Sequence, residues 1–178
     1  MTRPYWLWST LLTGGAVLGG ALQAQAQDPT TALVVRHAEK VSEASDAVLS
    51  EVGWRRAREL QRVTADVGVS VLFASQYARA QQTLQPIADR LELEILVHDA
   101  GDSEGLARRI VADHAGEVVL VSGHSNTVTA IVAALGAPEP PPVEDWDYDD
   151  LFVVTIGPGQ NARAVHLSYG EPSIQPEP

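Results

Sequence analysis

Residues 32–40 read Ala-Leu-Val-Val-Arg-His-Ala-Glu-Lys, and this stretch decides the fold. The first four residues form a short apolar run rich in β-branched side chains, which is typical of a buried strand. Arg36 and His37 follow at once. In an open parallel sheet, ligands bind beyond the carboxyl ends of the strands, so the sequence predicts a site directly after this strand.

The rest of the chain alternates apolar runs with amphipathic stretches, in which apolar residues recur at three- and four-residue steps. The expected strands cover residues 32–35, 69–74, 93–98, 118–121, 151–156 and 162–167. The expected helices cover residues 50–67, 79–91, 103–115 and a segment from Val128 to Leu135. This alternation predicts a mostly parallel sheet that is covered by helices on both faces.

We therefore expect an α/β fold, a three-layer α/β/α sandwich. The turn residues Gly-Pro-Gly-Gln-Asn at 157–161 predict a hairpin of the last two strands, which adds an antiparallel edge. In the helix 50–67, Arg55, Arg56 and Arg58 are expected to form an exposed charged face.

The N-terminal segment has the pattern of an export signal. Arg3 is the only charged residue before Asp28, and Ala24-Gln25-Ala26 offers small residues at a cleavage site. We expect residues 1–26 to be a signal peptide cleaved after Ala26, with an uncleaved anchor as the alternative. The protein would then be exported, either periplasmic or secreted.

Residues 27–170 are expected to form one domain, and residues 171–178, which include three prolines, a flexible tail. The chain has 12 basic and 23 acidic residues, so nucleic acid and anionic membranes are poor partners. No membrane contact is expected after the signal is cleaved. The absence of cysteine excludes disulfides, thiolate catalysis and Cys-ligated zinc.

Two further polar clusters follow predicted strands, namely residues 75–79, Ser-Gln-Tyr-Ala-Arg, and residues 123–126, Gly-His-Ser-Asn. Guanidinium groups hold phosphate with forked donors, and a neutral imidazole is a competent nucleophile. The residues thus predict that a histidine attacks a phosphorus atom held by Arg36 and Arg79, and that water then hydrolyses the phosphohistidine. This chemistry requires the rings of His37 and His124 to lie within about 8 Å of each other.

These clusters resemble the motifs of a known family. Leu33–Lys40 looks like the Arg-His-Gly motif of the histidine phosphatase superfamily, also called phosphoglycerate mutase-like. Ser75–Thr83 resembles its second block, Ser-x-x-x-Arg-Ala-x-x-Thr, and Val121–Thr127 resembles its last block. Leu49–Ala57 is similar to the helix that often lies between the first two blocks.

The resemblance implies that His37 is the phosphorylated nucleophile and that Arg36, Arg79 and His124 form the phosphate pocket. It also implies an α/β/α sandwich that needs neither a metal nor an organic cofactor. The substrate would be a small phosphorylated molecule: a phosphomonoester, a phosphoramidate or an acyl phosphate.

The sequence departs from the family pattern at two places. Ala38 replaces the glycine of the first motif, and Ser125 stands where one branch of the family has a proton-donating Asp. Asp99, at a predicted strand end, is the candidate proton donor. Asn126 and Lys40 are candidate substrate contacts, although helix capping is the commoner use of an asparagine in the position of Asn126.

Three other functions remain open from the sequence. Residues 123–127 follow a strand and open a helix, as the nucleophile elbow of a serine hydrolase does, with Ser125 as nucleophile. Thr127, however, occupies the position where that elbow has a glycine, and the two arginines would go unexplained. A non-catalytic module that binds phosphorylated ligands and a phosphoryl-transferring mutase are the remaining alternatives.

Overall fold

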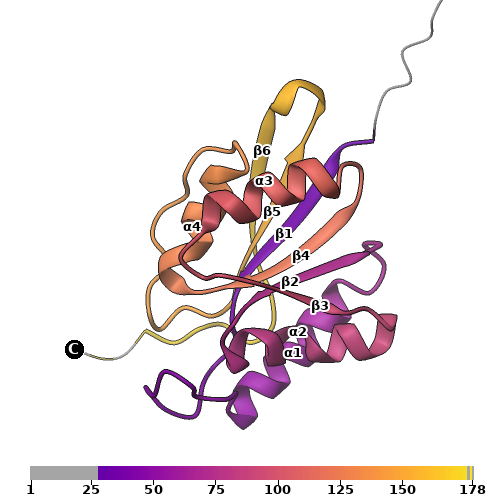
Figure 1. The fold of residues 1–178 in the computed structure, drawn as a ribbon. Coiled ribbons are helices and arrows are strands. Elements are labelled where there is room, and N and C mark those ends of the chain that lie inside the picture. The colour runs from indigo at the N-terminus through magenta and orange to yellow at the C-terminus, as the bar shows by residue number, and fades with distance from the viewer. Residues whose placement is uncertain (1–27, 176, 178) are drawn as a thin grey trace, which may run out of the picture.

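The computed structural model describes residues 28–175 and 177, which contain one six-stranded sheet in the order β3-β2-β4-β1-β5-β6 (Figure 1). The strands are β1 (Thr30–Arg36), β2 (Val71–Ser75), β3 (Ile95–His98), β4 (Val118–Gly123), β5 (Asp150–Ile156) and β6 (Ala162–Ser168). The helices are α1 (Glu51–Val63), α2 (Ala78–Leu91), α3 (Ser103–Asp113) and α4 (Ser125–Ala134), with a 3-10 turn, η1 (Pro158–Gln160), between the last two strands.

The predicted signal peptide, residues 1–26, lies outside the described residues. Among the residues that are described, no helix combines the length and the apolar character needed to cross a membrane. The described part of the predicted tail, residues 171–175 and 177, contains no helix or strand.

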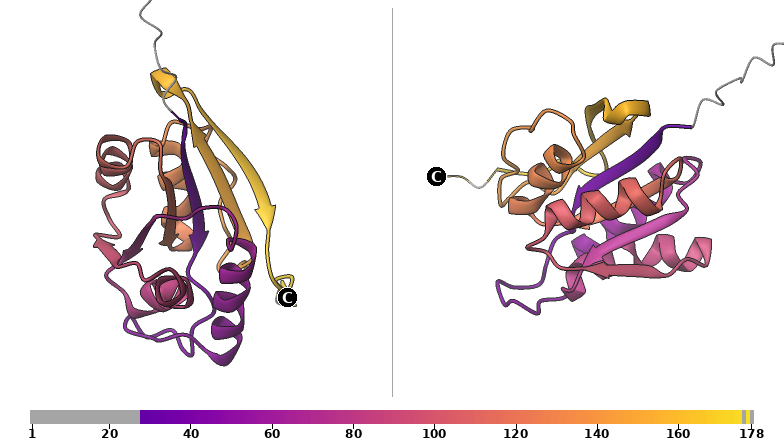
Figure 2. Two further views of the ribbon diagram at one scale, coloured as in Figure 1. Left: turned by 90° about the vertical axis from the view of Figure 1, so that its right-hand side faces the viewer. Right: turned by 45° about the horizontal axis from the view of Figure 1, so that its top comes forward.

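The pairing of the strands confirms a mostly parallel sheet with an antiparallel hairpin at its C-terminal edge. β1 pairs in parallel with β4, β4 with β2, and β2 with β3. β5 runs antiparallel to β1, and β6 runs antiparallel to β5 at the outer edge (Figure 2). The register sets Arg36 beside Gly123, so the segments after β1 and β4 leave the sheet side by side.

Helices pack on both faces of the sheet because side chains along a strand alternate between the faces. In β1, Val35 is buried in one apolar cluster with Leu60 of α1. Its neighbour Val34 is buried in another cluster with Ile110 of α3 and Val128 of α4. α1 lies beside α2 and α3 beside α4 (Figure 1), which confirms the predicted three-layer sandwich.

The helix α1 ends at Val63, four residues before the predicted end. The hydroxyl of Thr64 donates a hydrogen bond to the carbonyl oxygen of Leu60 at 2.7 Å, and the chain then turns. Gly68 follows with a φ of 81°, a left-handed conformation that glycine adopts without a steric penalty. The helix therefore ends before the glycine, at Thr64, and not at Gly68.

The prediction that Arg56 is exposed is wrong, because only 6% of its surface is accessible. Its Nε donates to Glu39 at 2.9 Å, and its Nη1 and Nη2 donate to the carbonyl oxygens of Tyr169 and Glu171. Helical spacing explains the burial, since Arg56 is four residues before the buried Leu60. The arginine thus ties the segment after β1 to the C-terminal segment.

Gly53 offers a direct test of how α1 packs on the segment after β1. A Cβ at this position would lie 2.2 Å from the carbonyl oxygen of Glu39. We predict that Gly53→Ala lowers the free energy of unfolding by about 1–3 kcal/mol, because backbone must move to relieve the overlap. Chemical denaturation measures the change. Gly157→Ala is the control, since its Cβ would make only an ordinary 3.6 Å contact; equal losses in the two variants would contradict the packing described.

Candidate active site

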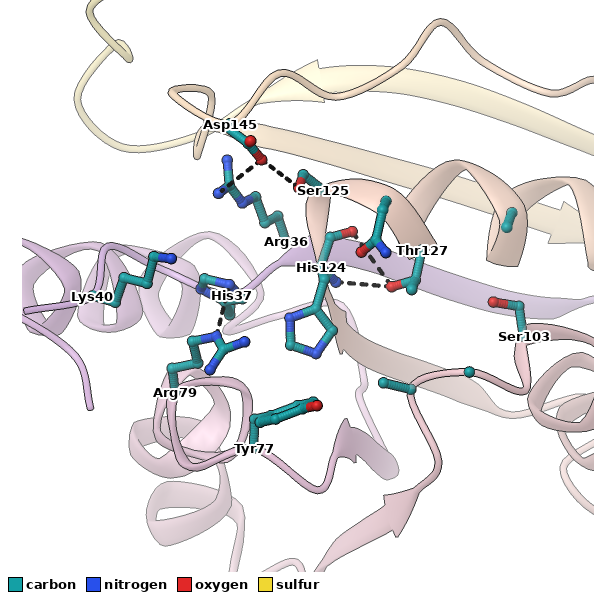
Figure 3. A pocket seen from close by; sticks show the side chains of 14 residues that line it. Arg36, His37, Lys40, Tyr77, Arg79, Ser103, His124, Ser125, Thr127 and Asp145 are labelled. Carbon is teal, nitrogen blue, oxygen red and sulfur yellow. Dashed lines mark hydrogen bonds and ion pairs between the residues drawn. The ribbon is translucent and has the colours of Figure 1, made fainter. Parts of the chain in front are cut away.

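The segments that follow β1, β2 and β4 meet in one cavity of about 560 Å³ (Figure 3). The structure brings together six of the seven residues predicted for the site. These residues, all of which line the cavity, are Arg36, His37, Lys40, Arg79, His124 and Asn126.

The contacts of His37 define which ring nitrogen carries the proton. Its Nδ1 lies 2.8 Å from the carbonyl oxygen of Ala38, and its Nε2 lies 3.1 Å from Nε of Arg79. A carbonyl oxygen can only accept and a guanidinium can only donate, so Nδ1 is protonated and Nε2 holds the lone pair. The nitrogen with the lone pair therefore lies on the side of Arg79.

The environment of His37 also disfavours a second proton. Burial lowers the pKa of His37 to about 3, and the positive charges of Arg36 and Arg79 act in the same direction. The hydrogen bond to Ala38 opposes this shift but does not outweigh it. Only 3% of the residue is accessible, so the ring that lines the cavity is buried as well as neutral.

Ala38, which replaces the glycine of the family motif, is fully buried. Its backbone N–H donates to Oγ1 of Thr83 at 2.9 Å, and that hydroxyl donates to the carbonyl oxygen of Arg79. The first and second sequence motifs are thus joined by hydrogen bonds behind His37. The alanine methyl is accommodated in the packed interior beside His37.

His124 faces His37 across the cavity. The two ring centroids are 5.1 Å apart, well within the limit that the predicted chemistry requires. Ser75 holds the His124 ring through a 2.8 Å contact between Oγ and Nε2, and the ring of Tyr77 packs against it at 5.2 Å. Burial, followed by the charges of the nearby cations, lowers the pKa of His124 to about 4.

Arg36 is 3% exposed, and its guanidinium is held at one end only. Nη1 donates to the carbonyl oxygens of Glu144 and Asp147 at 2.8 and 2.9 Å, and the ring of Tyr148 lies 4.0 Å from Cζ. Nε is buried without a hydrogen-bond partner among the described residues, and Nη2 lies 3.9 Å from Asp145. Nε therefore has no acceptor among the described residues, and the edge formed by Nε and Nη2 is the part of a guanidinium that can hold an oxyanion in a forked geometry.

The remaining cations lie around the mouth of the cavity. Arg79 donates through Nη1 to the carbonyl oxygen of Ser45 at 2.6 Å and lies over the ring of Tyr77. Lys40 forms an ion pair with Glu43, while Asn126 is exposed at the rim. Among the described residues, no group of three or more His, Asp or Glu side chains is arranged to hold a metal ion.

The structure does not bring Asp99 into this cavity. Its Oδ1 accepts a hydrogen bond from the backbone N–H of Gly101 at 2.7 Å, which is the local turn contact common for aspartate. Asp99 lines a separate, smaller void behind His124. Asp99 is therefore not among the residues that line the main cavity, and its role as proton donor stays a prediction.

Sequence reasoning missed Asp145, and it raised Tyr148 and Trp146 as flanking residues but favoured a surface loop for residues 138–150. Asp145 lines the cavity, and Tyr148 packs on Arg36 and lies 6.2 Å from the His37 ring. This loop carries no motif of the kind that marks the other segments. Ser75 and Tyr77, in contrast, belong to the second motif, so their nearness to Arg79 in sequence was an available signal.

Ser125 is placed differently from the nucleophile of a serine hydrolase. Its Oγ donates to Oδ1 of Asp145 at 2.8 Å, whereas the nearest predicted base, His124, contacts Ser75. A serine nucleophile needs an imidazole or another base as its hydrogen-bond acceptor in the activated arrangement. Ser125 has no hydrogen bond to a histidine among the described contacts; its hydroxyl bonds to Asp145 instead.

Comparison with known proteins matches residues 32–100 to the model described as histidine phosphatase superfamily, branch 1. No curated protein sequence is significantly similar to the chain. Among solved structures, the protein histidine phosphatase SixA, complexed with tungstate, is 21% identical with a TM-score of 0.60, covering 78% of this chain and 96% of that one.

Two other solved structures have the same fold. A mycobacterial glucosyl-3-phosphoglycerate phosphatase is 16% identical with a TM-score of 0.59, covering 78% of this chain and 98% of that one. A phosphoserine phosphatase mutant from Entamoeba histolytica, in complex with phosphoserine, is 13% identical with a TM-score of 0.59, covering 79% and 96%. At these identities the likeness is one of fold. The family model, which spans the first two motifs, agrees with the resemblance that the sequence motifs carry.

Proposed function

We propose that this protein is a phosphatase that hydrolyses a small phosphorylated substrate through a covalent phosphohistidine at His37. The proposal rests above all on the neutral ring of His37, whose Nε2 lone pair lies beside a cavity lined by two arginines. The unpartnered Nε of Arg36 adds support, because a buried donor without an acceptor is costly unless a ligand satisfies it.

In the first step, Nε2 of His37 forms a bond to phosphorus as the bond from phosphorus to the leaving oxygen breaks. In the second step, a water oxygen forms a bond to phosphorus as the bond to Nε2 breaks, which releases phosphate and restores the ring. Nδ1 keeps its proton throughout, and the carbonyl oxygen of Ala38 stabilises the positive charge that the ring carries in the intermediate.

The transferring phosphoryl group spreads its charge over the oxygens that do not react. The open edge of Arg36, the guanidinium of Arg79 and the ring of His124 surround the position that this group would occupy. Donors that are fixed in advance need little reorganisation during the reaction, which is the largest source of catalytic power in such sites. Here the donors are fixed by the loop before β5, Ser45 and Ser75.

The solved structures with this fold are named for different substrates, namely protein histidine, a glucosylated phosphoglycerate and phosphoserine. This variety supports phosphoryl transfer as the chemistry that these structures share. Each protein's own cavity then selects the group to which the phosphate is attached. A phosphomonoester and a phosphoramidate are both compatible with the nucleophile and the oxyanion donors of this chain.

The proposal is tested by trapping the intermediate. The protein is mixed with radiolabelled p-nitrophenyl phosphate, quenched in alkali and mapped by mass spectrometry, and we expect the label on His37. His37→Ala should lose the label and reduce phosphatase activity by about a thousandfold or more, because the nucleophile is gone.

Ser125→Ala separates this mechanism from the serine hydrolase alternative. It should keep the label on His37, since Ser125 contacts Asp145 rather than the histidine. Label on Ser125, or hydrolysis of p-nitrophenyl acetate that depends on Ser125 and not on His37, would contradict the proposal. Binding of the substrate without turnover or label would instead favour the non-catalytic module.

The protonation state of His37 gives a further prediction. Since its pKa is about 3, the ring loses its second proton above that pH and stays neutral as the pH falls from 7.5 to 4.5. We expect nitrogen NMR of the His37 ring to show no titration over this range. The urea-unfolded protein is the control, in which histidines titrate near about 6.5. A midpoint near 6.5 for His37 in the folded protein would refute the neutral nucleophile.

A further inference from the structure

Among the described residues that line it, the cavity contains one carboxyl group, that of Asp145, which takes no part in the two steps described above. We propose that Asp145 is the residue that transfers the proton in both steps of the reaction: it protonates the leaving oxygen and then takes a proton from the attacking water. This inference rests on the proposed phosphatase function.

Two neighbours hold the Asp145 carboxylate at the cavity. Oγ of Ser125 donates to its Oδ1 at 2.8 Å, and Nη2 of Arg36 lies 3.9 Å from the same oxygen (Figure 3). An oxyanion bound to Nη2 lies within about 3 Å of that nitrogen. A phosphoryl group whose non-reacting oxygens bind Nη2 therefore has its phosphorus, and the leaving oxygen bonded to it, near the carboxyl group of Asp145.

His37 is buried and Asp145 is exposed, and this difference decides on which side of the phosphorus each residue lies. His37 is 3% exposed at the floor, whereas 93% of the Asp145 side chain is accessible at the mouth. In-line displacement places the leaving oxygen on the side of the phosphorus opposite Nε2. With the nucleophile at the floor, the leaving oxygen points toward the mouth, where Asp145 lies.

The proton transfers balance over one cycle. In the first step, the carboxylic acid of Asp145 gives its proton to the leaving oxygen as that oxygen's bond to phosphorus breaks, and a carboxylate remains. In the second step, that carboxylate accepts a proton from the water that attacks phosphorus. The cycle ends with the carboxylic acid, neutral His37 and free phosphate.

Ser125 is a positioning residue in this scheme. It stands directly after the second histidine of the site and holds a carboxylate that comes from the loop before β5. A purely structural role for Asp145, as a weak partner that orients Arg36, is the competing explanation. The two explanations differ in how activity depends on the leaving group, because only a proton donor matters more for a poor leaving group.

The test compares Asp145→Asn with the wild-type protein on two substrates. Glycerol phosphate has an alkoxide leaving group that needs a proton, whereas p-nitrophenolate leaves readily without one. For Asp145→Asn we expect kcat/KM to fall by about 100-fold or more with glycerol phosphate and by less than about threefold with p-nitrophenyl phosphate. Slower hydrolysis of the phosphohistidine should also make labelled His37 accumulate.

Asp145→Glu and Glu139→Gln are the controls. Asp145→Glu keeps a carboxyl group and should restore part of the activity on glycerol phosphate. Glu139→Gln makes the same charge change on an exposed residue of the same loop and should leave both substrates unaffected. A similar loss on both substrates, or no loss on either, overturns the role of Asp145 while the label on His37 persists. If the wild type forms no label at all, the phosphatase proposal itself fails and takes this inference with it.

Discussion

The hydrogen bond from Nδ1 of His37 to the carbonyl oxygen of Ala38 controls the chemistry of the site. It keeps the proton of the neutral ring on Nδ1, so the lone pair is on Nε2, which accepts a hydrogen bond from Nε of Arg79. Burial beside positive neighbours then prevents a second proton from occupying that lone pair. A ring held in this way needs no separate base to act as a nucleophile, and its partner carbonyl can stabilise the charge of a phosphorylated ring.

The parallel pairing of β1, β4 and β2 makes this arrangement possible. It brings three segments, far apart in sequence, to one edge of the sheet, where each supplies one part of the cavity. The loop before β5 then crosses Arg36 and occupies its Nη1 with two carbonyl oxygens. These hydrogen bonds occupy Nη1 and orient the Nε and Nη2 edge, so in the proposed mechanism the oxyanion site is formed before any ligand binds.

The features that depend on residues close together in the sequence could be predicted from it. Within the described residues, apolar runs located the six strands and helical periodicity the four α-helices, and the motifs after the strands pointed to Arg36, His37, Arg79 and His124. The errors arose where a long-range contact decides the outcome. Arg56 is buried because Glu39 and two distant carbonyl oxygens satisfy its charge. The loop that delivers Asp145 has no periodicity, so only the tertiary structure reveals its place.

A crystal structure with vanadate tests the central claim most directly, because this ion mimics the transition state of phosphoryl transfer. The account predicts vanadium bonded to Nε2 of His37, with its oxygens on the Nε and Nη2 edge of Arg36, on Arg79 and on His124. Vanadate bonded to Ser125, or held in the cavity beyond bonding distance of His37, would contradict it.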